Sequence, residues 1–409
     1  MDVIVGGGVV GLSVAWRLAR SGRAVTVVDP APGRGASYAA AGMLAPVSEV
    51  SYTEEPLLRL GAASLRRWPS FAADLTADAG LDAGFDAGFS DAGSADGGFS
   101  NAARGGLDLR ADGTLDVAFG ADDLAALNEL AAFMDKLGLR VERLTGRECR
   151  RLEPMLAPSV RGGLLAPGDA WVDPRRVTAA LLKALERLDV PVVRARVSEL
   201  LRDGDRVIGV RLADDTAPDA DADPGAGREV GAGQVVLAAG AWSGELADVP
   251  VRPVKGQIMR LRSPQPLLGR CVRGTVHGTP VYLVPRGDGE LVLGATQEEL
   301  GFDTRVTAGG LYELLRDARE LVPGVTELEV ADVVAGLRPG TPDNLPLIGA
   351  SGTPGLVLAT GHHRGGVLLA PLTAALVASQ VTGDPEGGRT SEEGELAGLC
   401  SPARFRDIS

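Results

Sequence analysis

The stretch Val3–Gly11, with the sequence VIVGGGVVG, decides the fold of this chain. Its first three residues predict a short buried strand, and its glycines match the pattern G-x-G-x-x-G at Gly6, Gly8 and Gly11. In such a turn, Gly6 allows the tight bend, Gly8 lets the backbone approach a pyrophosphate, and Gly11 lets the next helix pack closely on the strand. The stretch therefore predicts the first turn of a dinucleotide-binding unit.

The residues after this turn complete a β-α-β unit. An apolar helical run from Leu12 to Ala19 precedes a second apolar strand at 24–28, which ends at Asp29. The N-terminus of such a helix offers free N–H groups to phosphates, and Asp29 is placed to accept hydrogen bonds from a ribose diol. A glycine-rich turn in another kind of α/β protein is the alternative, but strand, helix and acid together favour a Rossmann-like fold.

The composition is that of a globular chain with more than one domain. Because the chain has 409 residues, of which 45% are hydrophobic, we expect two or three domains. The net charge of −13 argues against nucleic acid as a partner and against a membrane surface bound through a basic patch. No signal-peptide pattern stands at the N-terminus, and no uninterrupted apolar run reaches about 18 residues. We therefore expect a cytoplasmic protein without membrane contact.

The cysteines and histidines do not predict a metal site. Cys149, Cys271 and Cys400 lie far apart in the sequence, so neither a zinc site nor a redox dithiol is indicated. His362 and His363 are adjacent, but no carboxylate or cysteine keeps ligand spacing with them.

Two biased segments interrupt the chain. Residues 76–106 are rich in Ala, Asp, Gly, Phe and Ser, and residues 213–233 in Asp, Ala, Pro and Gly, so we expect a surface insertion and an enlarged hairpin tip. Alternating strand patterns over 251–330 predict a mostly antiparallel sheet. The apolar segments 235–240 and 356–361 both read as strands that return to the parallel sheet begun by Val3. The nucleotide-binding part is then discontinuous in sequence.

Two segments near the C-terminus carry the candidate chemistry. The first, 336–349, places Arg338 at the end of an apolar strand before a proline turn, and the second, 361–369, runs from a glycine-rich turn into a helix. A guanidinium in a rigid position can hold a carboxylate in bidentate geometry. A structural salt bridge is the alternative for Arg338, and Tyr282 by itself is typical of strand packing.

With these motifs, the chain resembles the flavin-dependent amine oxidases of the D-amino-acid-oxidase superfamily, and above all the glycine oxidases that serve thiazole formation in thiamine biosynthesis. The resemblance covers nearly the whole chain outside the two biased segments. Besides the N-terminal glycine turn, these segments carry the resemblance: Ala39–Leu44, Val254–Gln257, Tyr282–Arg286, Gly336–Pro339 and Gly361-His362.

The resemblance implies the positions of FAD and of the substrate. It places the substrate carboxylate on Arg338 and Tyr282, and the amine end of the substrate near the backbone or side chain of Arg364. It implies that FAD is bound by the glycine turn, by the end of the second strand and the segment after it, and by the C-terminal turn. One further residue contacts the adenine. These residues are Gly6, Gly8, Val9, Val10, Gly11, Asp29, Pro30, Ala36, Ser37, Ala41, Gly42, Met43, Val197, Gly361, His362, His363, Arg364, Gly365, Gly366, Val367 and Leu368.

The chain departs from the pattern of the relatives at two positions. His363 stands where most relatives carry an aromatic residue, and Gly365 where they carry an asparagine. The resemblance also bears on the flavin linkage, because the sarcosine-oxidase branch often holds its flavin through a cysteine. The corresponding residue here is Gly336, so we predict non-covalent FAD.

The fold class expected is α/β, with a discontinuous Rossmann-like FAD-binding domain of the glutathione-reductase type and a substrate domain built on an antiparallel or mixed sheet. The expected FAD-binding parts are 1–75, 145–250 and 331–395. The expected substrate parts are 76–144, which contains the low-complexity insertion 76–106, and 251–330, and the C-terminal tail is 396–409.

The implied reaction is the oxidative deamination of glycine and other small amino acids, such as sarcosine and small D-amino acids. Hydride transfer to FAD leaves an imine, which hydrolyses to an α-keto acid (glyoxylate from glycine) and ammonia, and oxygen is reduced to hydrogen peroxide. The resemblance also implies a homo-oligomer, a tetramer in many relatives. The alternatives are a D-amino-acid or imino-acid dehydrogenase with another electron acceptor and a non-catalytic flavin-binding protein.

Overall fold

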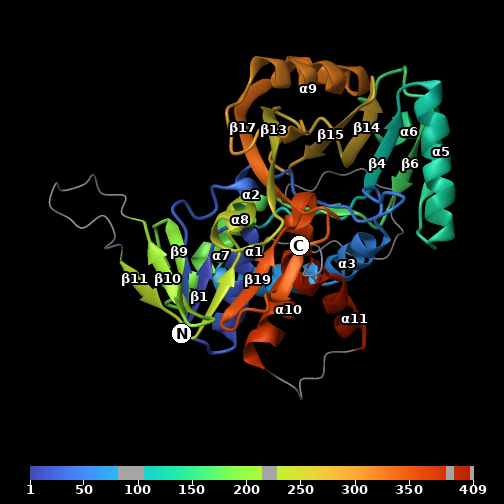
Figure 1. Cartoon of the computed structure of the whole chain (residues 1–409). Helices are drawn as coiled ribbons and strands as arrows, with labels where there is room; N and C mark the ends of the chain where they lie inside the picture. The colour runs from blue at the N-terminus through green and yellow to red at the C-terminus, as the bar shows by residue number, and fades with distance from the viewer. Residues whose placement is uncertain (82–105, 214–227, 384–390, 406–409) are drawn as a thin grey trace.

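The computed structural model describes residues 1–81, 106–213, 228–383 and 391–405. It contains a parallel sheet flanked by helices and, beside it, a larger mixed sheet (Figure 1). The fold class is the one that the sequence predicts, a Rossmann-like α/β part together with a mixed-sheet part.

The parallel sheet is assembled from three distant regions of the chain. Its strand order is β18-β19-β12-β1-β2-β8, and all neighbours are parallel except β18 and β19. Val3 pairs with Val235, which pairs with Leu356, so the predicted return of both later strands is confirmed. The bounds are β1 (Asp2–Val5), β2 (Val25–Val28), β8 (Val192–Val193), β12 (Gln234–Leu237), β18 (Leu347–Ala350) and β19 (Leu356–Thr360).

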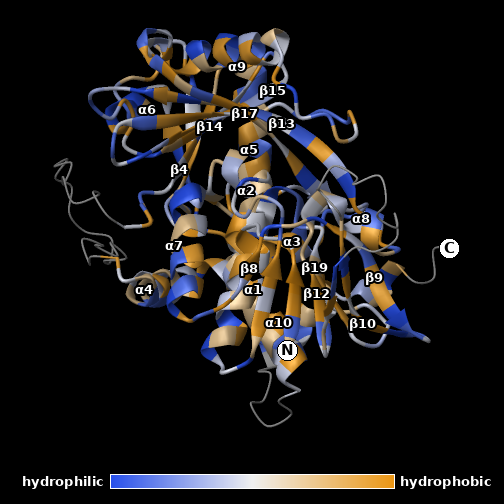
Figure 2. Cartoon of the chain, turned by 90° about the vertical axis from the view of Figure 1, so that its left-hand side faces the viewer, coloured by the Kyte–Doolittle hydropathy of each residue, from blue (hydrophilic) through white to orange (hydrophobic). Residues whose placement is uncertain are grey.

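Helices cover one face of this sheet and a small antiparallel sheet covers the other. Side chains alternate along each strand, so Ile4 packs with the helices while Val3 and Val5 face the small sheet. The helices are α1 (Val9–Arg20), α3 (Glu55–Leu65), α4 (Trp68–Ala79), α7 (Pro174–Arg187) and α10 (Gly366–Thr382). The small sheet consists of β9 (Val197–Asp203), β10 (Arg206–Leu212) and β11 (Glu229–Gly231). Figure 2 shows that α1, α10, β12 and β19 are mostly hydrophobic.

Helix α10 is apolar on all sides because it is enclosed by the protein. Together with the turn before it, it is long and apolar enough to cross a membrane, but 67% of its apolar window is buried inside the molecule. An apolar helix that is buried in this way is typical of a protein core.

The mixed sheet has the order β17-β13-β16-β15-β14-β4-β6-β5. Helix α9 (Ala308–Leu321) lies across one face (Figure 1), where Leu283 and Leu314 share a hydrophobic cluster. The other face packs on Ala41 and Trp171 of the nucleotide-binding part. The bounds are β4 (Thr114–Ala118), β5 (Glu142–Thr145), β6 (Gly162–Ala166), β13 (Arg252–Arg262), β14 (Cys271–Val276), β15 (Thr279–Pro285), β16 (Glu290–Gly294) and β17 (Glu329–Gly340).

The remaining elements are mostly short. They are α2 (Ala36–Ala39), β3 (Met43–Leu44), β7 (Ala170–Trp171), α8 (Ser243–Leu246), α5 (Ala121–Lys136), α6 (Gly146–Leu152), α11 (Ser391–Leu399) and the 3-10 turns η1 (Gly240–Trp242), η2 (Pro323–Glu327), η3 (His363–Gly365) and η4 (Pro402–Phe405). Strand β3 pairs with β7 between the two large sheets.

Some predicted boundaries differ from the structure. Strands β6 and β17 belong to the mixed sheet, although 145–250 and 331–395 were assigned to the FAD-binding part. Pairing across the sheet, which local patterns do not reveal, decides their membership. The amphipathic pattern over 57–75 predicts one helix, but the structure has two, α3 and α4, because Pro69 favours the first turn of a new helix.

The two biased segments lie mostly outside the described residues. Residues 76–79 belong to α4, and 82–105 are not described. The segment 214–227 is also not described, but the strands on its two sides, β10 and β11, pair antiparallel as expected for a hairpin.

Candidate active site

The glycine turn after β1 has the shape that a pyrophosphate requires. Gly6 has φ +115°, and a Cβ there would lie 2.6 Å from the carbonyl carbon of Ala238, while a Cβ on Gly11 would collide with the Gly6 carbonyl. Gly8 is different, since a Cβ there would make only ordinary contact with Ser37. Protein packing therefore accounts for Gly6 and Gly11 but not for Gly8, which leaves its backbone open to the approach that a pyrophosphate makes in such turns.

Helix α1 points its N-terminus at this turn. Gly8 is the N-cap and has no side chain that could satisfy the first N–H groups of the helix. The N–H of Val9 donates to Ser37 Oγ at 2.9 Å, and Val10 follows in the first turn. The first turn of the helix thus combines a positive dipole end with a glycine cap, which suits a phosphate group.

Asp29 is fixed beside the same turn at the end of β2. Its Oδ2 accepts the N–H of Gly7 and its Oδ1 accepts the N–H of Ala31, both at 2.7 Å. Each carboxylate oxygen of Asp29 keeps a second lone pair that can accept a hydrogen bond from a ribose hydroxyl. Pro30 is the next residue of the chain. Val197 begins β9 and shares a hydrophobic cluster with Val28, the residue before Asp29, so the predicted adenine contact lies near the predicted ribose contact.

A segment predicted to line the flavin runs between the two large sheets as α2 and β3. It contains Ala36, Ser37, Ala41, Gly42 and Met43. Gly42 has φ +80°, and a Cβ there would lie 2.7 Å from Pro174 Cδ.

A buried arginine of the mixed sheet holds this segment in place. Arg286 donates to the carbonyl of Ala41 and, at 3.1 Å, to that of Val172. It was noticed in the sequence only as part of a motif, because its acceptors are backbone groups far away in the chain.

The C-terminal turn forms the opposite wall. Gly361 has φ +75°, and a Cβ there would lie 2.6 Å from Thr341 Cγ2. His362 is buried and hydrogen-bonds Thr373 Oγ1 at 2.9 Å, and burial lowers the pKa of His362 to about 3. Both effects make His362 a neutral structural residue. Gly365, Gly366, Val367 and Leu368 then lead into α10.

His363 carries an orphaned polar atom. Its φ is +46°, and its Nδ1 is buried without a hydrogen-bond partner among the described residues. Burial, reinforced by Arg364 and Arg338, lowers the pKa of His363 to about 4, so the ring is neutral. A buried ring nitrogen without a partner costs free energy, and a bound flavin is polar along its pyrimidine edge. The residues present therefore fit FAD at this turn.

The Arg364 side chain is held by an acid rather than being free for the substrate. Its guanidinium forms an ion pair with Glu54 and donates to the Glu49 carbonyl at 3.4 Å. Arg364, Glu49, Glu54 and Leu368 line one small pocket. A cation paired in this way is poorly suited to receive an ammonium group.

Arg338 and Tyr282 come together on one face of the mixed sheet. The Arg338 Nη1 donates to the carbonyls of Lys255 and Thr296 at 3.3 and 3.2 Å. Among the described residues, no carboxylate forms an ion pair with Arg338, so the alternative of a structural salt bridge is not supported. A guanidinium that is held only by carbonyls keeps its charge available for an anionic ligand.

Two glycines make room for these side chains. A Cβ on Gly256 would lie 2.5 Å from Cζ of Arg338, and a Cβ on Gly294 would lie 2.6 Å from the hydroxyl oxygen of Tyr282. Burial raises the pKa of Tyr282 to about 12, although Arg338 opposes this. The phenol is therefore protonated and can donate. Neither glycine was identified from the sequence, because only the neighbouring strand explains it.

Strand β17 also passes close to α2. A Cβ on Gly336 would lie 2.7 Å from Cβ of Ala39, so no larger side chain fits there. This close approach supports the prediction that no residue at this position carries a covalent flavin.

Other charged groups of this region were not assigned from the sequence. Lys255 is fully buried, with its Nζ 3.4 Å from Glu298 and 3.8 Å from Asp303. In the sequence, only its position inside the Val254–Gln257 motif indicates that Lys255 lies near the site. Within the described ranges, no group of three or more His, Cys, Asp and Glu side chains is placed to hold a metal ion.

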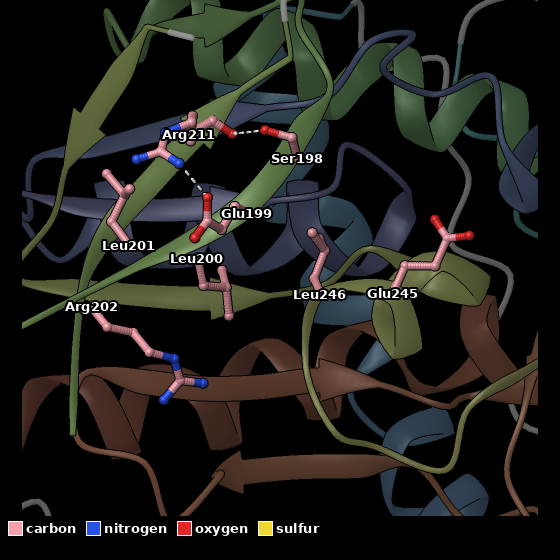
Figure 3. A pocket seen from close by; sticks show the side chains of 8 residues that line it. All are labelled: Ser198, Glu199, Leu200, Leu201, Arg202, Arg211, Glu245 and Leu246. Atoms are coloured by element: carbon pink, nitrogen blue, oxygen red, sulfur yellow. Dashed lines mark hydrogen bonds and ion pairs between the residues drawn. The ribbon is translucent and has the colours of Figure 1, made fainter. Parts of the chain in front are cut away.

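A second pocket lies at the β9 edge of the small sheet, beside α8. Figure 3 shows Arg211 between Glu199, with which it pairs, and Ser198, whose hydroxyl donates to the Arg211 carbonyl at 3.2 Å. None of the predicted site residues lines this pocket, and the Arg211 guanidinium pairs with both Glu199 and Glu229.

Comparison with known proteins agrees with this geometry. The family model of FAD dependent oxidoreductases (DAO) matches residues 3–380. The chain is 33% identical to glycine oxidase of Geobacillus kaustophilus over 92% of each chain. The crystal structure of glycine oxidase from the same organism superposes with a TM-score of 0.78 and 32% identity, covering 95% of each chain.

Some relatives are about twice as long as the part that matches this chain. The chain is 34% identical to the bifunctional protein ThiO/ThiG of Nostoc sp. over 93% of its own length but 52% of the relative, so it spans about half of that protein. The family match, the phosphate-binding turn and the fit at His363 lead to one conclusion: the chain belongs to the family of FAD-dependent oxidoreductases, and FAD is its cofactor.

Proposed function

We propose that this protein oxidises small amino acids such as glycine, sarcosine and small D-amino acids, with oxygen as the electron acceptor. The observation that carries the proposal is Arg338, a half-buried guanidinium without a carboxylate partner among the described residues, lying over Gly256 beside the Tyr282 hydroxyl. A site of this kind suits the carboxylate of an amino acid, because a planar guanidinium binds it in a fixed orientation.

The residues of the chain act mainly by orientation. Arg338 binds the substrate carboxylate, and the protonated Tyr282 donates a second hydrogen bond to it. Holding the carboxylate fixes the direction of the Cα–H bond, which lowers the entropic part of the barrier. Burial on the inner face of the mixed sheet excludes water and strengthens both interactions.

The chemistry that FAD supplies when bound is acceptance of the hydride from Cα and delivery of two electrons to oxygen, giving hydrogen peroxide. The residues that would hold it are those of the glycine turn, Asp29, the segment from Ala36 to Met43 and the turn around His363. The imine product hydrolyses to glyoxylate or another α-keto acid and ammonia.

The relatives support glycine as a substrate. The Geobacillus kaustophilus relative is named glycine oxidase and is similar over nearly its full length. A role in supplying thiazole formation for thiamine, in the cytoplasm, is part of the proposal and rests on the resemblance of the sequence to glycine oxidases; one relative is named bifunctional protein ThiO/ThiG. The expected tetramer also remains a prediction.

The test is to mix the FAD-loaded protein with glycine, sarcosine, D-alanine and D-proline under nitrogen and record the visible flavin absorption. We expect bleaching by at least one of them and peroxide when air is readmitted. Bleaching without rapid reoxidation in air would indicate a dehydrogenase with another acceptor. If none of these amino acids bleaches the flavin, the proposed substrate class is wrong.

A further inference from the structure

Strand β14 presents a second arginine beside the proposed carboxylate site. Arg273 pairs directly with Tyr282 across β14 and β15, and with Asp116 across β14 and β4. Residues that oppose each other in neighbouring strands project to the same face of a sheet. Arg273, Asp116 and Tyr282 therefore share one face.

The same register links Arg338 to this face. Tyr282 pairs with Gly294, Gly294 with Ile258, and Ile258 with Val334. Along β17, Arg338 lies four positions after Val334, an even step, so both project to that face. The two arginines thus lie on the same face, with Tyr282 on a strand between theirs.

Arg273 is poorly satisfied by the protein. Its one ion pair among the described residues is with Asp116, at 3.3 Å between Nε and Oδ2, and its Nη1 is buried without a hydrogen-bond partner there. Arg286, which also faces inward, donates to two backbone carbonyls. Both arginines keep one buried donor without a partner among the described residues, Nε in Arg286 and Nη1 in Arg273, but the terminal nitrogens of Arg286 are taken by those carbonyls while Nη1 of Arg273 is open.

The carboxylates around Arg273 keep its guanidinium charged. Glu49, Asp169 and Asp116 all interact electrostatically with Arg273; burial works against its charge, but these carboxylates keep its pKa above the usual value. Arg273 therefore stays a cation. A guanidinium has five N–H donors in a fixed fork, so Nε can remain with Asp116 while Nη1 binds an oxygen of a ligand. A donor buried without an acceptor costs free energy, which such a ligand would recover.

We propose that Arg273 binds a second carboxylate of the substrate, so that amino acids with an additional acidic group are bound more tightly than glycine. The chemical class is that of amino dicarboxylates, such as D-aspartate, D-glutamate and N-carboxymethylglycine. This inference rests on the proposed function, because Arg338 and Tyr282 must hold the first carboxylate while Arg273 binds the second.

A binding experiment tests this assignment without turnover. The FAD-loaded protein is titrated with succinate and glutarate and, as partners of equal length with one acid, butyrate and pentanoate, and the change in flavin absorption gives each Kd. We expect the dicarboxylates to bind about 10- to 100-fold more tightly, as for a hydrogen bond to a charged group. Arg273→Gln should remove this preference and leave the Kd of butyrate within about twofold.

The control is Arg270→Gln, which removes an arginine of similar exposure, also paired with an acid, Glu153, just before β14. This variant should keep the preference for dicarboxylates. If Arg273→Gln does not fold because Asp116 is left without its counter-ion, the double variant with Asp116→Asn removes both charges and should show the same loss. Equal affinity for mono- and dicarboxylates in the unmodified protein would overturn the assignment, as would a preference that survives removal of Arg273.

A turnover experiment separates this inference from the proposed function. Anaerobic flavin bleaching is compared for glycine and for the isosteric pair D-aspartate and D-asparagine. Bleaching by glycine with a faster reaction for D-aspartate than for D-asparagine supports both proposals. Bleaching by glycine without that difference refutes the role of Arg273 alone. Absence of bleaching by these three and also by sarcosine, D-alanine and D-proline refutes the proposed function as well.

Discussion

Replacement of Gly256 by alanine gives the sharpest test of how Arg338 is positioned. The new Cβ would lie 2.5 Å from Cζ of Arg338, whereas ordinary contact begins at 3.4 Å. The guanidinium must therefore retreat by about 1 Å, and a displacement of that size can reduce catalysis about 100-fold. This loss corresponds to about 2.7 kcal/mol of transition-state stabilisation. The measurement is kcat/KM for glycine, from the rate of anaerobic flavin reduction.

The stability of the protein should hardly change in this variant. The clash involves the end of a flexible side chain, and Gly256 does not have a positive φ, so the strand accepts alanine. Gly231→Ala is the matched control, because Gly231 also lies in a strand and a Cβ there meets nothing within 4 Å. If Gly256→Ala keeps kcat/KM within twofold of the control, with FAD bound and Tm unchanged, Arg338 does not act through the position described here.

The remaining predictions concern the carboxylate, the flavin and the pH. Arg338→Ala should cost about 3–5 kcal/mol in kcat/KM for glycine, because the substrate charge loses its partner, and unchanged kinetics would contradict its role. Acid precipitation should release all FAD into the supernatant, since Gly336 leaves no room for a larger side chain; colour in the pellet would show a covalent link. The pKa of His362 is depressed to about 3 by burial, so the unfolded state binds more protons and the His362 contribution to stability falls as pH drops from about 6.5 toward 3. The fall in Tm between pH 7 and pH 5 should therefore be smaller in His362→Gln than in the unmodified protein, and equal falls would argue against a neutral buried ring.

The nucleotide-binding turn could be predicted because its physical requirements are local. Gly6, Gly8 and Gly11 are needed within one turn and one helix, and Asp29 follows at the end of the next strand. The same holds for α9: the amphipathic pattern of the sequence over 308–321 predicts a helix, and the structure has one at Ala308–Leu321.

Features that depend on pairing between strands could not be predicted in the same way. Strand β6 reads like any short apolar segment, and its neighbours β4 and β5 place it in the mixed sheet. Gly256 and Gly294 look like ordinary strand glycines until the side chains above them are known. Arg273 becomes a candidate binding residue only when its pairing with Tyr282 on the neighbouring strand is known. The resemblance to a known family supplied Arg338 and Tyr282 but not the glycines that accommodate them.

The order in which the parallel sheet is assembled has a consequence for biosynthesis. Strand β1 can pair early with β2, which follows it closely in the chain, but its other neighbour β12 and the next strand β19 are made much later. Long-range parallel pairing is slow to form, so one edge of β1 stays open until residues 234–237 are made, and β19 joins the sheet only after residue 356. An apolar strand edge that stays open during synthesis is prone to aggregate. The yield of folded protein should then depend on chaperones and on the supply of FAD once β19 has been made.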